Sequence, residues 1–347
     1  MKKVSEFLCL AMSAGILFSS CEKQSGNQTP ALESLSVSPS ELVLEIGGTA
    51  DLLVEALPEN AEIGTITWTS SDDNIVAVDE NGSVTAVAAG KATVTASAGE
   101  INASCSVTVM ADPQAGDILY SDGTWSTDLE AGKTPVAVIF WAGDATADDP
   151  ELKNDFPECT RGLAVALTQK ISPWQYNWDA YGSMVNDWVE ANTSYVPVYT
   201  KPSGEYFNKC IGYSNTKAMS EFNAAAENSE WPIEAIQVVD EYNSTVAAPE
   251  GTSGWYLPSP KELSLLCSGE VEGSIWDIVS DTDMKVTINE VLSGIDGAEN
   301  LFESGYWTSA EYSKSNPYYV FFYDGAIYND LRKSYESNAA VRCILAF

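Results

Sequence analysis

The chain has 347 residues, with 50 acidic and 17 basic side chains and a formal net charge of −33. Because a phosphate backbone requires a basic surface, this balance argues against nucleic acid as a partner. The sequence contains no histidine, which excludes Ser-His-Asp and Cys-His catalysis and every His-ligated zinc or copper site.

The start of the chain indicates a targeting segment. Two lysines precede an apolar run at residues 7–18 that is too short to span a bilayer. Residues 17–21, Leu-Phe-Ser-Ser-Cys, resemble a lipobox, in which the cysteine is acylated and becomes the mature N-terminus. The resemblance implies a signal peptide over residues 1–20, a lipid anchor on Cys21 and a place in the outer membrane at the cell surface. The polar residues 21–31 are predicted to form a tether.

Short, alternating apolar segments bounded by Gly, Asn, Asp and Pro turns occupy residues 32–111. This texture predicts an all-β sandwich. Trp-Thr-Ser-Ser at 68–71, Ile-Val-Ala-Val at 75–78 and Gly-Lys-Ala-Thr-Val at 90–94 resemble the group 2 bacterial Ig-like domain. The resemblance implies a spacer that holds a terminal module away from the membrane, with Trp68 in its core.

The terminal module, residues 116–347, contains a helix start with complete capping signals. Residues 254–263 read Gly-Trp-Tyr-Leu-Pro-Ser-Pro-Lys-Glu-Leu. Ser259 is the predicted N-cap and Glu262 completes a capping box, so a helix is predicted over 259–268. A second helix is predicted to start at Asn215-Thr216, with Met219, Phe222 and Ala226 on its inward face.

Two later motifs make the pattern more specific. Residues 306–312 read Tyr-Trp-Thr-Ser-Ala-Glu-Tyr, and Val-Arg-Cys follows at 341–343. With the capped helix, they resemble a bacterial domain of unknown function with a C-type-lectin-like fold, found also in major paralogous lipoproteins and at the end of collagen-like adhesins. The chain is therefore expected to be an all-β Ig-like sandwich followed by an α+β C-type-lectin-like domain.

An aromatic hairpin is predicted over residues 318–330, with a two-residue type I′ turn at Asp324-Gly325. Strand alternation separates Tyr318, Val320 and Phe322 from Tyr319, Phe321 and Tyr323. One set must pack on the core, and the other is either covered by another layer or exposed. The predicted ligand contacts, for an extracellular glycan or protein, are those of an exposed aromatic face: Tyr319, Tyr323, Tyr328 and Asn329.

The cysteines allow two interpretations. In an oxidising compartment a bridge is predicted from Cys267, at the end of the capped helix, to Cys159 or Cys343. The alternative is that the module's cysteines, Cys210 included, are buried free thiols. Cys105 in the sandwich is predicted to be a buried thiol.

The predicted function is binding or adhesion without catalysis. A structural subunit of a surface appendage is the second interpretation. A carboxylate-dependent glycan hydrolase is the third, although no acid pair stands out among so many acids. No cofactor or metal is expected. Calcium is an alternative, because Asn316-Pro317 and Tyr328-Asn329-Asp330 partly resemble the calcium loop and strand of lectins, without the glutamate that precedes the proline.

Overall fold

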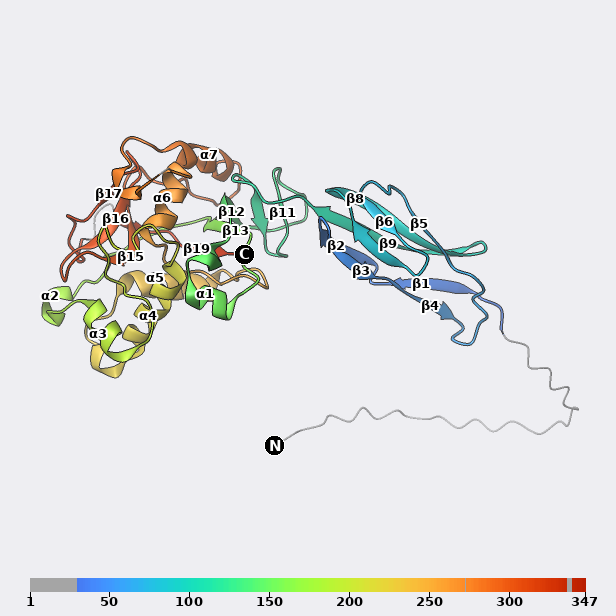
Figure 1. Cartoon of the computed structure of the whole chain (residues 1–347), viewed down its shortest axis with the longest axis horizontal. Helices are drawn as coiled ribbons and strands as arrows, with labels where there is room; N and C mark the ends of the chain where they lie inside the picture. Colours follow the sequence, from blue (N-terminus) through green and yellow to red (C-terminus); the bar gives the residue numbers. More distant parts are fainter. Residues whose placement is uncertain (1–29, 272, 336–338) are drawn as a thin grey trace, which may run out of the picture. The chain divides into compact units, whose positions relative to one another are not determined.

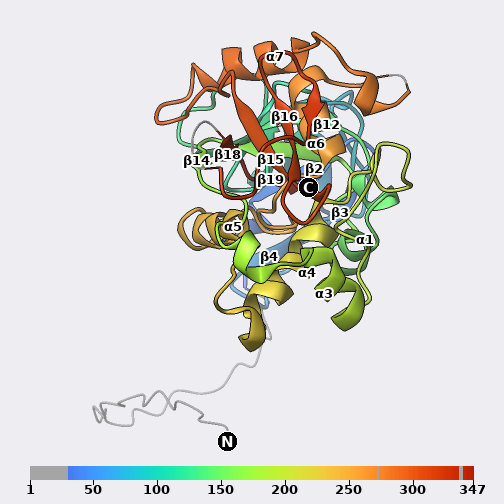
Figure 2. The same ribbon diagram turned by 90° about the vertical axis from the view of Figure 1, so that its left-hand side faces the viewer.

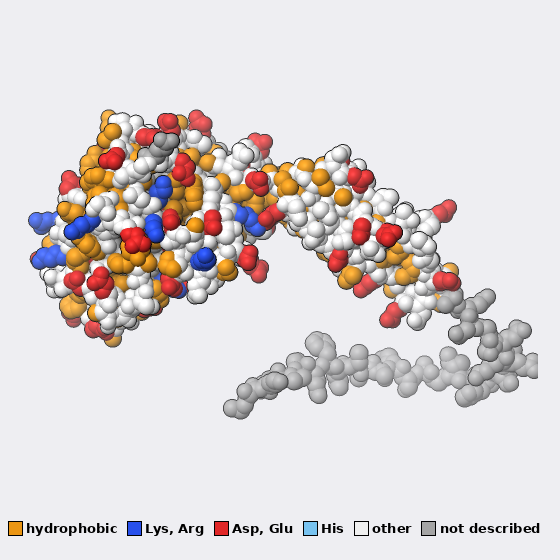
Figure 3. All heavy atoms as spheres, viewed as in Figure 1, with side chains coloured by type: hydrophobic (Ala, Val, Ile, Leu, Met, Phe, Trp, Pro, Cys, Tyr) orange, Lys and Arg blue, Asp and Glu red, His pale blue; other side chains and the backbone are white. Residues whose placement is uncertain are grey.

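The computed structural model describes residues 30–271, 273–335 and 339–347 (Figure 1). The predicted signal peptide, the lipidation site Cys21 and most of the tether lie outside the described residues. The chain divides after Val109 into two compact units. In the described part of the chain, no helix has both the length and the apolar character needed to cross a membrane. Acidic side chains are spread over the visible faces of both units (Figure 3).

The described part of the first unit consists of strands without helices. They are β1 (Ser34–Ser38), β2 (Glu41–Glu45), β3 (Thr49–Asp51), β4 (Leu53–Leu57), β5 (Thr67–Ser70), β6 (Val76–Val78), β7 (Ser83–Ala86), β8 (Gly90–Ala98) and β9 (Ile101–Met110). One sheet has the order β2-β9-β8-β5, and β3-β7-β6 and β1-β4 form two more sheets. Because side chains alternate along each strand, one face of every sheet supplies a shared apolar core. The predicted sandwich is confirmed.

Trp68 and Gly82 form a close contact in this unit. Trp68 is half-buried and packs on the core, as predicted, and Cys105 is a fully buried thiol. A Cβ at Gly82 would lie 2.5 Å from the Trp68 ring, and Gly82 has a φ of +86°. Only glycine, which has no Cβ and readily adopts a positive φ, fits at this position.

The second unit combines two sheets with several helices. Its strands are β10 (Ile118–Tyr120), β11 (Trp125–Ser126), β12 (Pro135–Ala142), β13 (Gly162–Ala166), β14 (Lys170–Ile171), β15 (Gly305–Glu311), β16 (Pro317–Phe321), β17 (Ile327–Tyr328), β18 (Ala339–Val341) and β19 (Ile344–Ala346). Its helices are α1 (Pro150–Asp155), α2 (Trp178–Tyr181), α3 (Val185–Asn192), α4 (Gly212–Ala224), α5 (Glu234–Thr245), α6 (Pro260–Ser268) and α7 (Asp283–Leu292), with 3-10 turns at Ala145–Ala147, Ala226–Asn228 and Ile275–Asp277. The sheets have the orders β11-β10-β12-β13-β19 and β14-β18-β15-β16-β17.

Two apolar clusters lie on opposite faces of these strands. Figure 2 shows α6 and α7 on one side and α3, α4 and α5 on the other. Tyr318, Val320 and Phe322 join the cluster that contains α6 and α7, whereas Trp307 and Tyr319 join the cluster that contains α3 to α5. The predicted separation of the two aromatic sets along β16 is confirmed.

The capping prediction is confirmed for α6 and wrong for α4. Glu262 accepts a hydrogen bond of 2.6 Å from the Ser259 backbone N–H, and Ser259 Oγ accepts one of 3.4 Å from the Glu262 N–H. Helix α4 instead begins at Gly212, so Asn215 and Thr216 lie inside it. Their polar side chains hold tertiary partners: Asn215 donates to the hydroxyl of Ser309, and Thr216 Oγ1 accepts from the Leu257 N–H.

The inward face of α4 is only partly as predicted. Met219 and Phe222 are buried, but Ala226 is exposed because the helix ends at Ala224. The predicted two-residue turn at Asp324-Gly325 is also wrong. The Phe321 N–H donates to the Ala326 carbonyl, so four residues, 322–325, connect the strands. A type I′ turn needs two residues with positive φ, and here only Gly325 has one.

The predicted disulfide from Cys267 to Cys159 or Cys343 is absent, because all five described cysteines are free and buried. Cys343 belongs to the α3–α5 cluster, on the opposite face of the strands from Cys267. Cys159 shares the cluster of Cys267, but its thiol donates to the Gly251 carbonyl at 3.3 Å. Burial raises the pKa of Cys159 to about 11 and that of Cys267 to about 12, so these thiols stay protonated and unreactive.

Candidate functional site

The four predicted contact residues have different surroundings. Tyr319 is 7% exposed and Tyr323 is 68% exposed, whereas Tyr328 and Asn329 are half-buried. The rings of Tyr319 and Tyr328 stack with centroids 5.6 Å apart. Their hydroxyls donate to Asp330 at 2.7 Å and to Asp324 at 2.8 Å, respectively. The prediction treated these residues as one surface, but the structure divides them into the stacked pair of Tyr319 and Tyr328, the exposed ring of Tyr323 and the half-buried Asn329.

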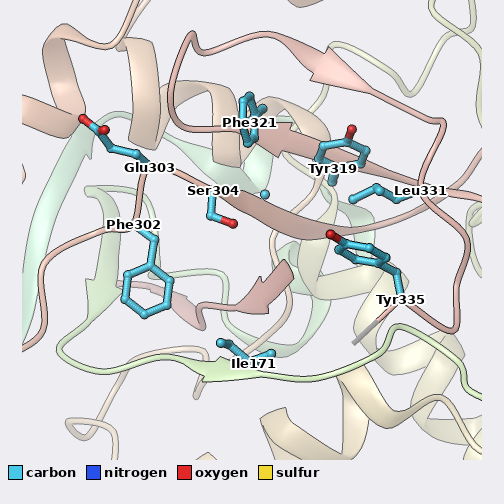
Figure 4. A pocket seen from close by; sticks show the side chains of 9 residues that line it. Ile171, Phe302, Glu303, Ser304, Tyr319, Phe321, Leu331 and Tyr335 are labelled. Carbon is cyan, nitrogen blue, oxygen red and sulfur yellow. The ribbon is translucent and has the colours of Figure 1, made fainter. Parts of the chain in front are cut away.

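Tyr319 lines a pocket of about 610 Å³, which we call the aromatic pocket (Figure 4). Its walls combine aromatic and aliphatic side chains with a few polar groups. The lining residues are Ile171, Phe302, Glu303, Ser304, Gly305, Tyr319, Phe321, Leu331 and Tyr335. Four aromatic rings thus surround a space large enough for a small ligand.

The order of the strands brings these residues together. Ile171 ends β14, residues 302–304 lead into β15, Tyr319 and Phe321 belong to β16, and residues 331–335 follow β17. Gly305 forms part of the wall and lies close to the Tyr319 ring, since a Cβ at position 305 would be 3.0 Å from that ring. A larger residue at position 305 would therefore displace that ring.

The electrostatics of the aromatic pocket favour binding over catalysis. Among its nine lining residues Glu303 is the only carboxylate, and it lies 3.7 Å from the Lys285 ammonium. Burial and the neighbouring Asp330 raise the pKa of Tyr319 well above its usual range, so its hydroxyl is a neutral hydrogen-bond group. Hydrolysis of a glycoside by two acids requires a second carboxyl group facing the first, which this lining does not supply.

Three carboxyl groups elsewhere have raised pKa values. Asp240 is exposed in another pocket, where partial burial of its carboxyl raises the pKa, whereas Glu262 and Asp149 are structural. Burial raises the pKa of Glu262 to about 7, and burial also raises that of Asp149. Each side chain is fully enclosed, and each accepts several hydrogen bonds that tie α4 to its neighbours, such as those from Gly212 N to Glu262 and from Ser214 N to Asp149. Without access to solvent, neither group can reach a substrate.

The calcium alternative involves residues that make structural hydrogen bonds. Asn316 Nδ2 donates to the Leu331 carbonyl at 2.9 Å, and Asp330 accepts the Tyr319 hydroxyl. Throughout the described ranges, no three His, Cys, Asp or Glu side chains are grouped so that they could hold a metal ion.

Four apolar members of the pocket were not predicted: Ile171, Phe302, Leu331 and Tyr335. They come from three regions of the chain, and none lies in a recognisable motif. One signal was available in the sequence, since Leu331 and Tyr335 flank a short basic run directly after the aromatic hairpin.

Residues 31–109 match the family model described as bacterial Ig-like domain (group 2). The first unit is a bacterial Ig-like domain. Over a longer region, the chain is 25% identical to the "Putative fimbrium tip subunit Fim1C" of Bacteroides ovatus, across 60% of this chain and 40% of that protein. The match therefore spans well under two thirds of that relative's length.

A solved structure shares the fold over most of the chain. A crystal structure of a fimbrial protein from Bacteroides ovatus covers 91% of this chain and 71% of its own, with a TM-score of 0.56 and 17% identity. At this identity the match shows a shared fold. A lacto-N-biosidase of Bifidobacterium bifidum is 42% identical over 93 residues, which are 25% of this chain but only 8% of that enzyme.

Proposed function

We propose that the protein is a non-enzymatic subunit of a cell-surface fimbrium, and that its second unit binds an extracellular ligand in the aromatic pocket. The similarity to a putative fimbrium tip subunit and the fold shared with a fimbrial protein support the first part. The pocket itself is the observation that carries the second part.

The pocket fits a recognition role for a physical reason. Exposed apolar surface costs free energy in water, and contiguous patches of it usually mark interaction sites. Here Phe302, Phe321 and Tyr335 keep part of their ring surface open although Tyr319 beside them is packed. Rigid aromatic rings provide contact area at a low cost in side-chain entropy.

The remaining parts of the chain have roles consistent with this proposal. Cys21 would carry the lipid anchor, the Ig-like unit would be the spacer, and the second unit would be the C-type-lectin-like binding module. Tyr323, exposed beside the Phe321 ring at 6.1 Å, together with Tyr328 and Asn329, would extend the contact surface beyond the pocket. The ligand class at this level is a glycan or protein outside the cell.

The experiment uses the chain from residue 22 onward, which retains every described residue. It is applied to arrays of glycans and extracellular-matrix proteins. Phe321→Ala and Tyr335→Ala should each weaken binding at least tenfold while the chain remains folded, although both rings pack on the α3–α5 cluster and their loss lowers stability. Leu129→Ala, at an exposed position outside the pocket, is the matched control and should bind normally.

Two results would overturn the proposal. Normal binding by both pocket variants would show that recognition occurs elsewhere. Absence of binding by the unmodified chain would favour the purely structural subunit, which the same fimbrial relatives also support.

A further inference from the structure

Three short segments concentrate positive charge on this acidic chain. Residues 199–204, 312–317 and 331–335 contain three lysines and one arginine but no aspartate or glutamate. In the whole sequence, by contrast, 50 acidic residues stand against 17 basic ones. A local excess of cations is therefore unusual in this protein.

The three segments lie side by side although they are far apart in the sequence. The Lys333 N–H donates to the Ser315 carbonyl at 2.9 Å, which joins the second and third segments. The Thr200 N–H donates at 3.2 Å to the carbonyl of Glu311, the residue before the second segment. Backbone hydrogen bonds therefore connect the three segments within the second unit.

Three of the four cations in these segments point into solvent. Lys201, Lys314 and Arg332 are exposed, while Lys333 is buried against the Glu311 carboxylate. Figure 3 shows Lys and Arg side chains gathered at the end of the second unit, near the place where Figure 1 draws α2. Lys333 is therefore not accessible to a ligand, whereas the other three cations are open to solvent.

A second pocket of about 830 Å³ opens beside Arg332, and we call it the Arg332 groove, because this arginine is the one cation among its described lining residues, next to two aspartates. Its lining residues are Tyr176, Trp178, Asp179, Asp330, Leu331, Arg332, Ser334 and Tyr335. The Arg332 guanidinium lies over the Trp178 ring, 6.0 Å from its centroid, which restricts its orientation. Leu331 and Tyr335 line the aromatic pocket as well, so the two hollows are adjacent.

We propose that the aromatic pocket and the Arg332 groove together bind an anionic saccharide. A sugar ring occupies the aromatic pocket, and its carboxylate or sulfate group lies at Arg332, with Lys201 and Lys314 on the connected segments. This inference rests on the proposed function, because it names the ligand class of the same site. It adds that recognition depends on the ligand's charge.

The groove suits this ligand because it contains an arginine that can bind the acid group and two aspartates that can accept hydrogen bonds from the sugar hydroxyls. A guanidinium offers a planar fork that matches a carboxylate or sulfate. Asp179 and Asp330 accept hydrogen bonds from hydroxyl groups, as Asp330 already does from Tyr319. The overall charge does not prevent binding, since exposed charges more than about 8 Å apart are largely screened from one another at physiological ionic strength.

An acidic protein segment is the competing occupant. It would bring several carboxylates toward Asp179 and Asp330 and would supply few hydroxyls to them. A saccharide with a single acid group can place that group at Arg332 and offer its hydroxyls to the two aspartates, so the lining favours a saccharide. A poly-glutamate peptide therefore serves as a probe for this competitor.

The test uses the chain from residue 22 onward and paired probes that differ in one acid group. 3′-Sialyllactose is compared with lactose, and 6-sulfo-N-acetyllactosamine with N-acetyllactosamine, which distinguishes a carboxylate source from a sulfate source. At least one anionic probe should bind tenfold more tightly than its neutral counterpart. Arg332→Gln should abolish that difference, and 0.5 M salt should reduce it. Lys153→Gln, at an exposed cation on α1, should leave it unchanged.

The other possible outcomes show whether the charge inference, the location of the site or the proposed function is wrong. If neutral and anionic probes bind equally and Phe321→Ala weakens both, the charge inference fails while the proposed function stands. If Arg332→Gln retains the full preference for the anionic probe, the groove is not the site. Arg332-dependent binding of poly-glutamate that matches the saccharide would replace the saccharide with an acidic protein. Failure of all saccharide and protein ligands would overturn both proposals.

Discussion

Lys333 and Glu311 form an ion pair in which neither side chain has any exposed surface. Glu311 also accepts hydrogen bonds from the backbone N–H groups of Val185, at 3.1 Å, and Asn186, at 2.8 Å. Lys333 donates in addition to Gln175 Oε1 at 3.1 Å. The pair and its hydrogen bonds therefore connect the end of β15 and the start of α3 to residues 331–335, the segment that contributes to both pockets.

Replacing Lys333 by methionine should be strongly destabilising. Burial lowers the pKa of Lys333 while the Glu311 charge opposes that change, so the ammonium is kept charged by its partner. Without it, the Glu311 carboxylate remains buried and uncompensated. The free energy of unfolding should fall by about 3–5 kcal/mol, as measured by urea denaturation.

The matched control is the double variant Lys333→Met with Glu311→Gln. The single amide oxygen of the glutamine replaces two carboxylate oxygens, so the substituted side chain can still accept from either Val185 or Asn186. Because no buried charge is left, part of the lost stability should return. A single variant as stable as the unmodified protein would show that the pair is not needed for folding.

Glu262 should make stability depend on pH. Burial raises its folded pKa from 4.5 to about 7, so the folded state binds more protons than the unfolded state between those values. The stability that protonation supplies is complete below pH 4.5 and is lost as the pH rises through about 7. The loss amounts to about 3 kcal/mol for a shift of this size.

Glu262→Gln isolates this effect. The glutamine oxygen can accept from Gly212 N and Ser259 N as the carboxylate does, but it cannot ionise. The variant should therefore gain about 3 kcal/mol relative to the unmodified protein between pH 4 and pH 8. Glu250→Gln, at an exposed position, should give a constant difference. A constant difference for Glu262→Gln too would contradict the raised pKa.

The thiols of the folded chain should be unreactive. All five described cysteines are free and buried, and burial raises the pKa of Cys343, for example, to about 12. Ellman's reagent at neutral pH should label none in the native chain from residue 22 onward and all five after denaturation without a reductant. Only three labelled thiols in the denatured protein would instead indicate one disulfide.

Cys21 is the predicted lipidation site. Cells that produce the full chain should incorporate labelled palmitate into it, and the protein should partition into detergent, because acyl chains hold it at a membrane. Cys21→Ala should remove both the label and the partitioning. The neighbouring Ser20→Ala change keeps the small residue that a lipobox requires and is the control. Palmitate labelling of the Cys21→Ala variant would place the lipid elsewhere.

Local signals in the sequence were sufficient for the separate elements. The capping box of Ser259 and Glu262 involves residues three apart, and the two faces of β16 follow from strand alternation. Sequence spacing also specified the sandwich of the first unit. Each of these features depends on neighbours along the chain, so one sequence is enough to predict it.

The pocket depends on neighbours in space. Ile171 and Tyr335 are far apart in the sequence and meet only because β14, β18 and β15 are adjacent in one sheet. The predicted pairing of Cys267 with Cys343 depends on the same kind of information, since in the structure these two cysteines face different clusters. Strand order and the face that a side chain occupies are tertiary properties, which local patterns do not determine.

The tyrosines of the hairpin should separate stability from binding. Tyr319 is buried, contacts the Tyr328 ring and donates to Asp330, so Tyr319→Ala should cost about 3 kcal/mol of stability. Tyr323 is 68% exposed, and Tyr323→Ala should change stability by less than about 0.5 kcal/mol. Urea denaturation measures both values. If Tyr323→Ala also leaves ligand binding unchanged, the exposed ring has no part in recognition, whereas equal destabilisation by both variants would mean that Tyr323 is packed in solution.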